Sequence, residues 1–230
     1  MKTYAFIFAR GGSKGLPRKN LLKINGLSLV EHSINIALGI ESINQVYVST
    51  EDSEIASISS QSGAEIIKRP LHLAADDSPE WLSWQHAVNY VLKKEGKFDN
   101  FLSLPPTSPL RSIDDVEKCL NKLDASNDIV ISITKSRRNP WFNMVKFENN
   151  FLELVNNDEI NIKRRQDTPN TFDIGTVAYV CRPEFILKNN SIWDGKVSGV
   201  EIPFERSIDI DDLVDFEIAT FLADRKKGDS

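Results

Sequence analysis

Cysteine, histidine and long apolar runs are all scarce in this sequence. It has 2 cysteines and 3 histidines in 230 residues. Cys119 and Cys181 lie far apart without metal-type spacing, so we expect two reduced, buried thiols in a cytoplasmic protein. No apolar run is long enough to span a bilayer. Lys2 is followed by only a short apolar run before Arg10, so we also expect no secretory signal.

Histidine catalysis and an excess of positive charge are missing as well. No Ser-His-Asp order is recognisable; His32 and His86 lie in predicted helices, which favours structural roles, and His72 lies in an irregular loop. The formal net charge of −5 argues against a nucleic-acid binder. The cations gather instead at residues 10–23 and 163–165, which indicates small anionic ligands.

What the sequence does contain is an alternation of apolar strands and helical patterns with short connections. Ser28 and Glu31 form a capping box at the start of one helix, and Trp81 and Trp84 lie at helical spacing in another, which favours a core role over a base-stacking platform. This rhythm is typical of an α/β fold with a mostly parallel sheet and helices on both faces. Strands are predicted at residues 3–9, 45–50, 64–67, 100–104, 129–133, 176–180 and 200–204.

The alternation breaks between residues 135 and 171. There a β-hairpin is predicted around Asn149 and Asn150, followed by a polar segment. We interpret this region as an excursion from the main sheet. Residues 1–225 are thus predicted to form a single domain with an inserted excursion at 136–170, and 226–230 a disordered tail. A short helix is predicted from Pro183 and a last one at 213–223.

A glycine-rich, basic loop at residues 9–20 follows the first strand directly. Glycines let the backbone turn tightly and approach a ligand, and successive amides there can form an anion-binding concavity. We predict a polyphosphate site; the alternative is a surface loop with solvated charges. The loop matches neither the GxxxxGK[ST] nor the GxGxxG pattern. Its glycines are Gly11, Gly12 and Gly15, and its cations are Arg10, Lys14, Arg18 and Lys19.

Two further segments complete the candidate site. Residues 105–111 hold three prolines after a predicted strand, which predicts a stiff loop at the strand's carboxyl end, where open α/β sheets bind ligands. In the extended segment 207–211, we expect Asp209 and Asp211 to point to one side while Ile208 and Ile210 pack inward. Two carboxylates on one side suit Mg²⁺ held jointly with phosphates. Asp211 or Asp212 is also expected to cap the last helix.

Together these segments resemble the CMP-sialic acid synthetases, also called acylneuraminate cytidylyltransferases, over residues 3 to about 215. The glycine loop resembles their amino-terminal signature, and the other matching motifs follow in the family's order. These are Val48-Ser49-Thr50-Glu51-Asp52, Arg69-Pro70, Leu73-Ala74 with Asp76, Pro106-Thr107-Ser108-Pro109-Leu110-Arg111 and Ser207-Ile208-Asp209-Ile210-Asp211.

The resemblance implies a Rossmann-like nucleotide-diphospho-sugar transferase fold. It also implies a homodimer, with the hairpin excursion at the dimer interface. The implied reaction joins CMP from CTP to the anomeric hydroxyl of a 2-keto-3-deoxy sugar acid and releases pyrophosphate, with Mg²⁺. CTP and an acidic keto-sugar are the expected partners, with neither nucleic acid nor membrane.

The resemblance also implies roles for particular residues. Arg10, Lys14, Lys19 and Asp209 would be catalytic. The nucleotide would be bound by Arg10, Gly11, Gly12, Ser13, Lys14, Lys19, Asn20, Arg69 and Ser78, the last three at the cytidine. Asp209 and Asp211 would hold Mg²⁺. Thr107, Ser108, Arg165 and Asp173 would contact the sugar, with Arg164 and Lys135 as further candidates for its carboxylate, reached across the dimer interface.

Two departures from the family pattern fall on the sugar side. Pro105 stands where the family usually has a glutamine, and 172–176 replaces an Arg-Pro-Asn-Gly stretch. Cytidylyl transfer is therefore better supported than sialic acid itself, and a related nonulosonic or octulosonic acid is an open alternative. The sequence also leaves open a sugar-1-phosphate nucleotidyltransferase and a non-catalytic nucleotide-binding homologue. A phosphatase is disfavoured because no Asp-x-Asp motif follows the first strand.

Overall fold

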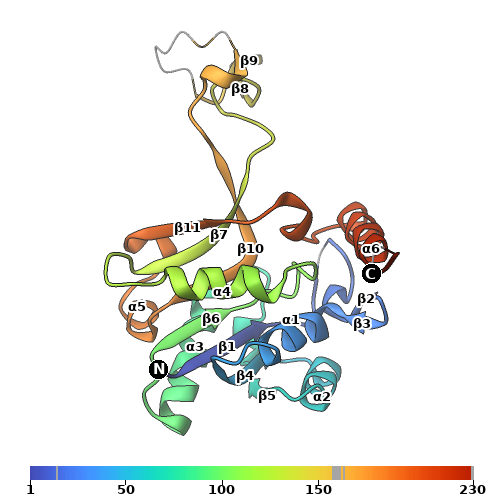
Figure 1. The fold of residues 1–230 in the computed structure, drawn as a ribbon, viewed down its shortest axis with the longest axis vertical. Coiled ribbons are helices and arrows are strands. Elements are labelled where there is room, and N and C mark those ends of the chain that lie inside the picture. Colours follow the sequence, from blue (N-terminus) through green and yellow to red (C-terminus); the bar gives the residue numbers. More distant parts are fainter. Residues whose placement is uncertain (14, 157–161, 163, 229–230) are drawn as a thin grey trace.

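The computed structural model describes residues 1–13, 15–156, 162 and 164–228. A mixed sheet of seven strands forms the centre of this described part, in the order β11-β7-β10-β6-β1-β4-β5 (Figure 1). Every pair in it is parallel except those of β10, which runs antiparallel to β6 and β7. The mostly parallel α/β sheet is thus confirmed. The strands are β1 Thr3–Phe8, β4 Ile43–Thr50, β5 Glu65–Lys68, β6 Asn100–Ser103, β7 Ile129–Lys135, β10 Phe172–Cys181 and β11 Val197–Glu201.

Helices cover both faces of this sheet, as predicted. Alternating side chains of β1 point to opposite faces: Ala5 and Ile7 join the core beneath α1, α2 and α4, whereas Tyr4 and Phe6 join the core beneath α3 and α5. The two tryptophans of α3, Trp81 and Trp84, are buried in the second core, which confirms their structural role. The helices are α1 Leu29–Leu38, α2 Ser53–Gln61, α3 Glu80–Glu95, α4 Ile113–Lys122, α5 Pro183–Lys188 and α6 Leu213–Gly228.

The excursion stands away from the sheet at the end of two long connecting segments (Figure 1). It carries the hairpin of β8 Val145–Glu148 and β9 Phe151–Leu154, and Asn149 and Asn150 take the left-handed backbone that a tight two-residue turn requires, with φ of 48° and 69°. The predicted asparagine hairpin is confirmed. Its strands leave large apolar side chains exposed, which a hairpin alone in water does not favour.

Some elements differ from the sequence prediction. A small hairpin of β2 Lys23–Ile24 and β3 Leu27–Ser28 was not predicted, although Asn25-Gly26 is a strong turn signal. The late strand β11 lies a few residues earlier than 200–204. Helix α6 runs to Gly228, so residues 226–228 are helical within the segment 226–230 for which we predicted disorder. Residues 229–230 lie outside the described residues.

A buried ion pair positions the segment that carries the candidate aspartates. Arg206, just before that segment, donates from Nε to Asp115 Oδ2 at 2.7 Å and from Nη2 to Oδ1 at 3.0 Å. Asp115 is 1% exposed at its side chain and also forms a capping box with Ser112 at the start of α4. Burial by itself raises the pKa of Asp115, but the Arg206 bonds and those from Ser112 outweigh it and hold the pKa below its usual range.

Arg206→Ala is therefore expected to destabilise the fold at pH 7 by about 2–3 kcal/mol, because it leaves a buried carboxylate without its partner. Because the pKa of Asp115 is lower in the folded than in the unfolded protein, its ion pair stabilises the fold at pH values above the unfolded pKa of about 3.9. This stabilisation is lost as the pH falls through the pKa of the folded protein. The difference in unfolding free energy between wild type and variant should thus shrink below about pH 4. Denaturant titrations at several pH values measure it. Lys118→Ala, which removes an exposed pair on the same helix, is the matched control and should leave stability nearly unchanged.

Candidate active site

A cavity of about 580 Å³ opens where the carboxyl ends of β1 and β6 meet the loops that follow them. Segments far apart in the sequence converge on it: the glycine loop, residues 69–83, the proline loop 105–107, β10 and the aspartate segment. This is where an open α/β sheet is expected to bind its ligand. The cavity brings together most of the predicted site residues that the structure describes, namely Arg10, Ser13, Lys19, Asn20, Arg69, Ser78, Thr107, Asp209 and Asp211.

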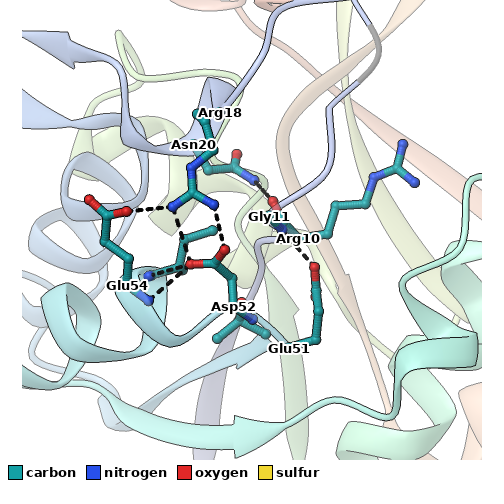
Figure 2. Close-up of polar contacts among 9 residues, drawn as sticks. Arg10, Gly11, Arg18, Asn20, Glu51, Asp52 and Glu54 are labelled. Carbon is teal, nitrogen blue, oxygen red and sulfur yellow. Dashed lines mark hydrogen bonds and ion pairs between the residues drawn. The ribbon is translucent and has the colours of Figure 1, made fainter.

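Arg18 bonds the glycine loop to the start of helix α2 (Figure 2). It has a left-handed backbone with φ of 55°, and its guanidinium donates to Asp52 Oδ2 at 2.5 Å and to Glu54 Oε2 at 2.6 Å. Asp52 Oδ1 also accepts from the amides of Glu54 and Ile55, both at 3.0 Å, and so caps α2. Arg18 is absent from the cavity lining. This loop cation therefore bonds the loop to α2 and does not line the cavity.

Backbone groups of the same loop are held from both sides. The Gly11 amide donates to Glu51 Oε1 at 2.7 Å, and Asn20 Nδ2 donates to the Arg10 carbonyl at 2.9 Å (Figure 2). Neither Gly11 nor Gly12 lines the cavity, so their role at the nucleotide stays a prediction. These two bonds hold the backbone of Arg10 and Gly11 in place.

Two loop cations do line the cavity. Arg10 Nη1 donates to Asp76 Oδ1 at 2.8 Å, and Lys19 Nζ donates to Asp211 Oδ1 at 3.0 Å. The Lys19 side chain is only 15% exposed. Lys14, the remaining predicted cation, lies outside the described residues. Arg10 and Lys19, near the start and the end of the loop, thus both bring positive charge to the cavity, as binding of a polyphosphate requires.

The aspartate segment has the predicted alternation. Ile208 and Ile210 are buried against α6 and its neighbours, whereas Asp209 and Asp211 line the cavity. Asp212 caps α6, since its Oδ1 accepts from the Asp215 amide at 3.0 Å. The cap therefore does not use either of the two aspartates at the cavity.

The Asp209 carboxyl has an unused ligand atom. Its Oδ1 is buried and has no hydrogen-bond partner within the described residues. Burial, and then the charge of Asp211, raise the pKa of Asp209, while bonds from the Thr107 and Thr176 hydroxyls act in the opposite direction. Within the described part, no group of three or more histidine, cysteine or acidic side chains is placed to hold a metal ion. Two carboxylates with a free buried oxygen fit a hard cation that completes its shell with phosphate oxygens and water.

Arg69 forms another wall of the cavity and is itself buried. Its Nε donates to Ser49 Oγ at 3.2 Å and its Nη2 to the Ser49 carbonyl at 2.6 Å, while its guanidinium lies 5.7 Å from the centre of the Phe8 ring. Burial lowers the pKa of Arg69. Nearby, Ser78 Oγ is buried without a hydrogen-bond partner in the described part of the chain. Both residues can therefore still donate to a ligand.

The proline loop is held by a buried arginine that the sequence analysis gave no separate role. Arg111 donates from Nε to the Ser108 carbonyl at 2.7 Å and from Nη2 to the Pro105 carbonyl. Burial lowers the pKa of Arg111 to about 9. Ser108, predicted to touch the sugar, is itself fully buried, with its Oγ 2.6 Å from Thr176 Oγ1. Ser108 therefore positions Thr176, which does line the cavity together with Thr107.

The other two predicted sugar contacts lie away from this cavity within one chain. Arg165 lines a second pocket of about 300 Å³ at the base of the excursion, together with Lys135. Asp173 accepts a hydrogen bond from Ser136 Oγ at 2.7 Å. Arg164 pairs with Asp167 at 2.9 Å. Within the described part of the chain Arg165 and Asp173 do not line the main cavity, so their roles at the sugar stay predictions.

Several residues that line the cavity were not predicted. Glu80, at the start of α3, accepts a hydrogen bond from Trp84 Nε1 at 3.1 Å. Desolvation raises the pKa of its carboxyl, although the Trp84 bond and the charge of Arg69 act in the opposite direction. Thr176 and Tyr179 come from β10, the antiparallel strand. The only sequence signal for Glu80 was its place directly after the irregular segment 69–79, at the start of a helix.

A bulge in β10 explains why Thr176 faces the cavity. The pairing with β7 shifts between Ile174 and Tyr179, and the buried Ser132 hydroxyl replaces the missing ladder bonds. Ser132 Oγ accepts from the amides of Val177 and Ala178 at 3.1 and 3.3 Å and donates to the Gly175 carbonyl at 2.8 Å. Bulges redirect side chains in this way near active sites.

Comparison with known protein sequences gives consistent matches. Residues 4–96 match the sequence model described as Cytidylyltransferase. The chain is 34% identical over 227 residues to post-translational flagellin modification protein B of Campylobacter coli, over 96% of this chain and 94% of that protein. The CMP-N,N'-diacetyllegionaminic acid synthase of Campylobacter jejuni matches with the same identity and coverage. The N-acylneuraminate cytidylyltransferase of Escherichia coli is 24% identical over 98% of this chain and 53% of that protein.

Solved structures share the fold. A CMP:2-keto-3-deoxy-manno-octonic acid synthetase solved with CTP superposes with a TM-score of 0.72 at 18% identity, over 98% of this chain and all (100%) of that one. A 4-diphosphocytidyl-2C-methyl-D-erythritol synthase superposes with a TM-score of 0.70 at 11% identity, over 96% and 98% of the two chains. The predicted Rossmann-like nucleotidyltransferase fold is confirmed.

Proposed function

This chain belongs to the cytidylyltransferase family, and we propose that it transfers CMP from CTP to the anomeric hydroxyl of a 2-keto-3-deoxy sugar acid, releasing pyrophosphate. One observation carries the proposal most directly. The basic glycine loop and the two aspartates of 207–211, almost two hundred residues apart, line one cavity, where Lys19 bonds to Asp211. Cations and metal-binding carboxylates at one point are what nucleotidyl transfer requires.

The roles of the loop residues follow from charge and position. Arg10 and Lys19, with Lys14, would bind the β- and γ-phosphates and offset the charge that grows on pyrophosphate as it leaves. The anomeric oxygen attacks the α-phosphorus in line; the new P–O bond forms while the bond to pyrophosphate breaks, and the hydroxyl proton leaves to solvent or to a phosphate oxygen. Glu51 and Asp52 already hold Gly11 and Arg18 of the loop, which reduces the ordering that these two residues need when the triphosphate binds.

Asp209 and Asp211 would hold Mg²⁺, which would neutralise phosphate oxygens and orient the triphosphate. The unpartnered Asp209 Oδ1 and the absence of an internal third ligand in the described part support a metal shared with the substrate. The cytidine would lie against Asn20, Arg69 and Ser78, of which Arg69 and Ser78 have hydrogen-bonding capacity left for a ligand.

The acceptor is proposed to be a nonulosonic acid, with N,N'-diacetyllegionaminic acid the first to test. The relative at 34% identity named as CMP-N,N'-diacetyllegionaminic acid synthase supports this choice. Thr107 would contact the sugar directly and Ser108 would act through Thr176. Pro105 offers no side-chain hydrogen bond there, which agrees with an acceptor other than sialic acid.

We also propose a homodimer formed through the excursion. The exposed Phe147, Phe151 and Leu152 of the hairpin would be buried against the second chain, and Arg165 and Asp173 would then reach the sugar in the partner's cavity. Light scattering tests this dimer: wild type should have the mass of two chains, and the double variant Phe147→Glu with Phe151→Glu should have the mass of one.

We place the enzyme in the cytoplasm, where CTP is made; both cysteines are free thiols. Helices of the described residues are too short or too polar to cross a membrane.

The activity is tested by pyrophosphate release with Mg²⁺, each of the four nucleoside triphosphates, and a panel of 2-keto-3-deoxy sugar acids and sugar 1-phosphates. Release with CTP and a sugar acid is expected. Release only with a sugar 1-phosphate would replace the proposal with the second candidate, a sugar-1-phosphate nucleotidyltransferase of the same fold. Binding of CTP without release on any acceptor would indicate a non-catalytic homologue.

A further inference from the structure

Glu80 lines the cavity, and no role proposed above uses it. It opens helix α3, and its Oε1 accepts a hydrogen bond from Trp84 Nε1 at 3.1 Å. Trp84 is 4% exposed and lies against the rings of Phe101 and Tyr179, with centroids 5.2 and 5.5 Å away. A rigid core side chain therefore holds the carboxyl from behind, while the carboxyl stays open to the cavity.

Glu80 and Arg69 form an acceptor and donor pair on one wall. Both line the cavity, and each one's charge favours the charged form of the other. Arg69 uses Nε and Nη2 on Ser49, and Nη1 makes no hydrogen bond within the described residues. Glu80 Oε2 likewise has no hydrogen bond in the described part of the chain. The wall thus presents one free N–H donor group and one free carboxylate oxygen.

That pair is complementary to the edge of cytosine. Cytosine carries a 4-amino donor next to acceptors at N3 and O2, whereas uracil carries an acceptor at O4 and a donor at N3. A guanidinium can donate only, and an ionised carboxylate can accept only. Cytosine therefore satisfies both groups, whereas the O4 of uracil would face a carboxylate oxygen.

We propose that Glu80 recognises the 4-amino group of cytosine and makes the site select CTP over UTP. The proposal rests on the proposed use of CTP. Asn20 and Ser78, which also line the cavity, carry groups that both donate and accept and so cannot distinguish the two bases by themselves. Beside the positive charge of Arg69, which favours its ionised form, the Glu80 carboxylate can only accept, and in that form it excludes UTP.

The test is equilibrium binding of CTP and of UTP, each with Mg²⁺ and without acceptor, to wild type and to Glu80→Gln. Glutamine keeps an oxygen for the Trp84 bond, but its amide can also turn an N–H toward the O4 of uracil. The ratio of CTP to UTP affinity is expected to fall by about 10- to 100-fold, the effect of one hydrogen bond to a charged group. Asp77→Asn changes an exposed carboxylate of the same segment outside the cavity and should leave the ratio unchanged.

An unchanged CTP to UTP ratio in Glu80→Gln, with the melting temperature of wild type, would overturn the proposal. So would a variant whose only defect is a raised KM for the sugar acid, because Glu80 would then face the acceptor. If wild type binds CTP selectively through Glu80 but transfers CMP to no acceptor, the proposed function fails and this inference stands. If wild type transfers CMP while the variant keeps its selectivity, this inference alone fails.

Discussion

Asp209→Asn is expected to lower kcat about a thousandfold in a protein that remains folded. An amide nitrogen or neutral oxygen in place of the carboxylate weakens Mg²⁺ binding, and the transition state then loses about 4 kcal/mol of charge stabilisation. Asp209 Oδ1 is buried, has no hydrogen-bond partner within the described residues, and is therefore available to a metal ion.

The fold itself should not suffer from this substitution. Burial and the charge of Asp211 raise the pKa of the Asp209 carboxyl, so its charged form is disfavoured in the folded protein, and a neutral amide of the same shape removes that cost. We expect a melting temperature equal to or above that of wild type. Kinetics at increasing Mg²⁺, together with thermal melts, measure both effects.

Asp211→Asn is the matched comparison. Its side chain is 76% exposed and already bonds to Lys19, so the loss of activity should be smaller and should be partly restored at high Mg²⁺. Equal and small losses in the two variants would show that Asp209 is not the principal metal ligand. A strongly lowered melting temperature in Asp209→Asn would mean that its role is structural.

Gly15→Ala is expected to lower kcat/KM for CTP about a hundredfold. The glycine loop passes so close to the aspartate segment that an added Cβ would lie 2.5 Å from the Asp211 carbonyl oxygen. Backbone cannot yield as a flexible side chain can, so the loop and the aspartates must move apart. Since Lys19 and Asp211 are bonded across this contact, a shift of even 1 Å misplaces cation and metal ligand together.

The comparison for this variant is Gly12→Ala, in the same loop. A Cβ at Gly12 meets no atom within 4 Å, so its effect should be far smaller. Steady-state kinetics with CTP as the varied substrate, and thermal melts of both variants, separate a local shift from general unfolding. Equal kcat/KM values for the two alanine variants would show that the close approach at Gly15 does not matter for catalysis.

Local signals were sufficient for much of the fold. Ser28 and Glu31 form the predicted capping box, Asp52 caps α2, and Pro183 begins α5. Asn149 and Asn150 form the predicted hairpin turn. Each of these features depends on residues within a few positions of one another, and short-range sequence patterns report such interactions directly. The turn at Asn25 and Gly26, which was not predicted, has a sequence signal of the same kind.

The order of the strands could not be predicted in this way. Strand β10 enters the sheet antiparallel between β6 and β7, and its pairing with them depends on contacts between residues 37 to 80 positions apart. Nothing in the sequence of residues 172–181 alone indicates which strands pair with it. The bulge that turns Thr176 toward the cavity depends on Ser132, a residue of another strand. Long-range pairing therefore decided which side chains of β10 line the site.

In the candidate site, too, local motifs were predicted from the sequence, whereas contacts between distant residues were not. The resemblance to the CMP-sialic acid synthetases, drawn from motifs, agrees with the cytidylyltransferase match and with the curated relatives. The glycine loop and the aspartates meet as predicted. However, motifs did not reveal that Arg18 is bonded to Asp52 and Glu54, away from the cavity, or that Ser108 is buried. Glu80 has no local pattern that distinguishes it from an ordinary helix-start glutamate.

Cytidylyl transfer is tested most directly by identifying the product that the wild-type enzyme makes from CTP and N,N'-diacetyllegionaminic acid with Mg²⁺. Mass spectrometry and phosphorus NMR should show a phosphodiester that joins CMP to the anomeric carbon of the sugar acid, with one pyrophosphate released for each molecule formed. A cytidine diphosphate sugar, release of orthophosphate, or unchanged CTP with every keto-sugar acid offered would contradict the claim.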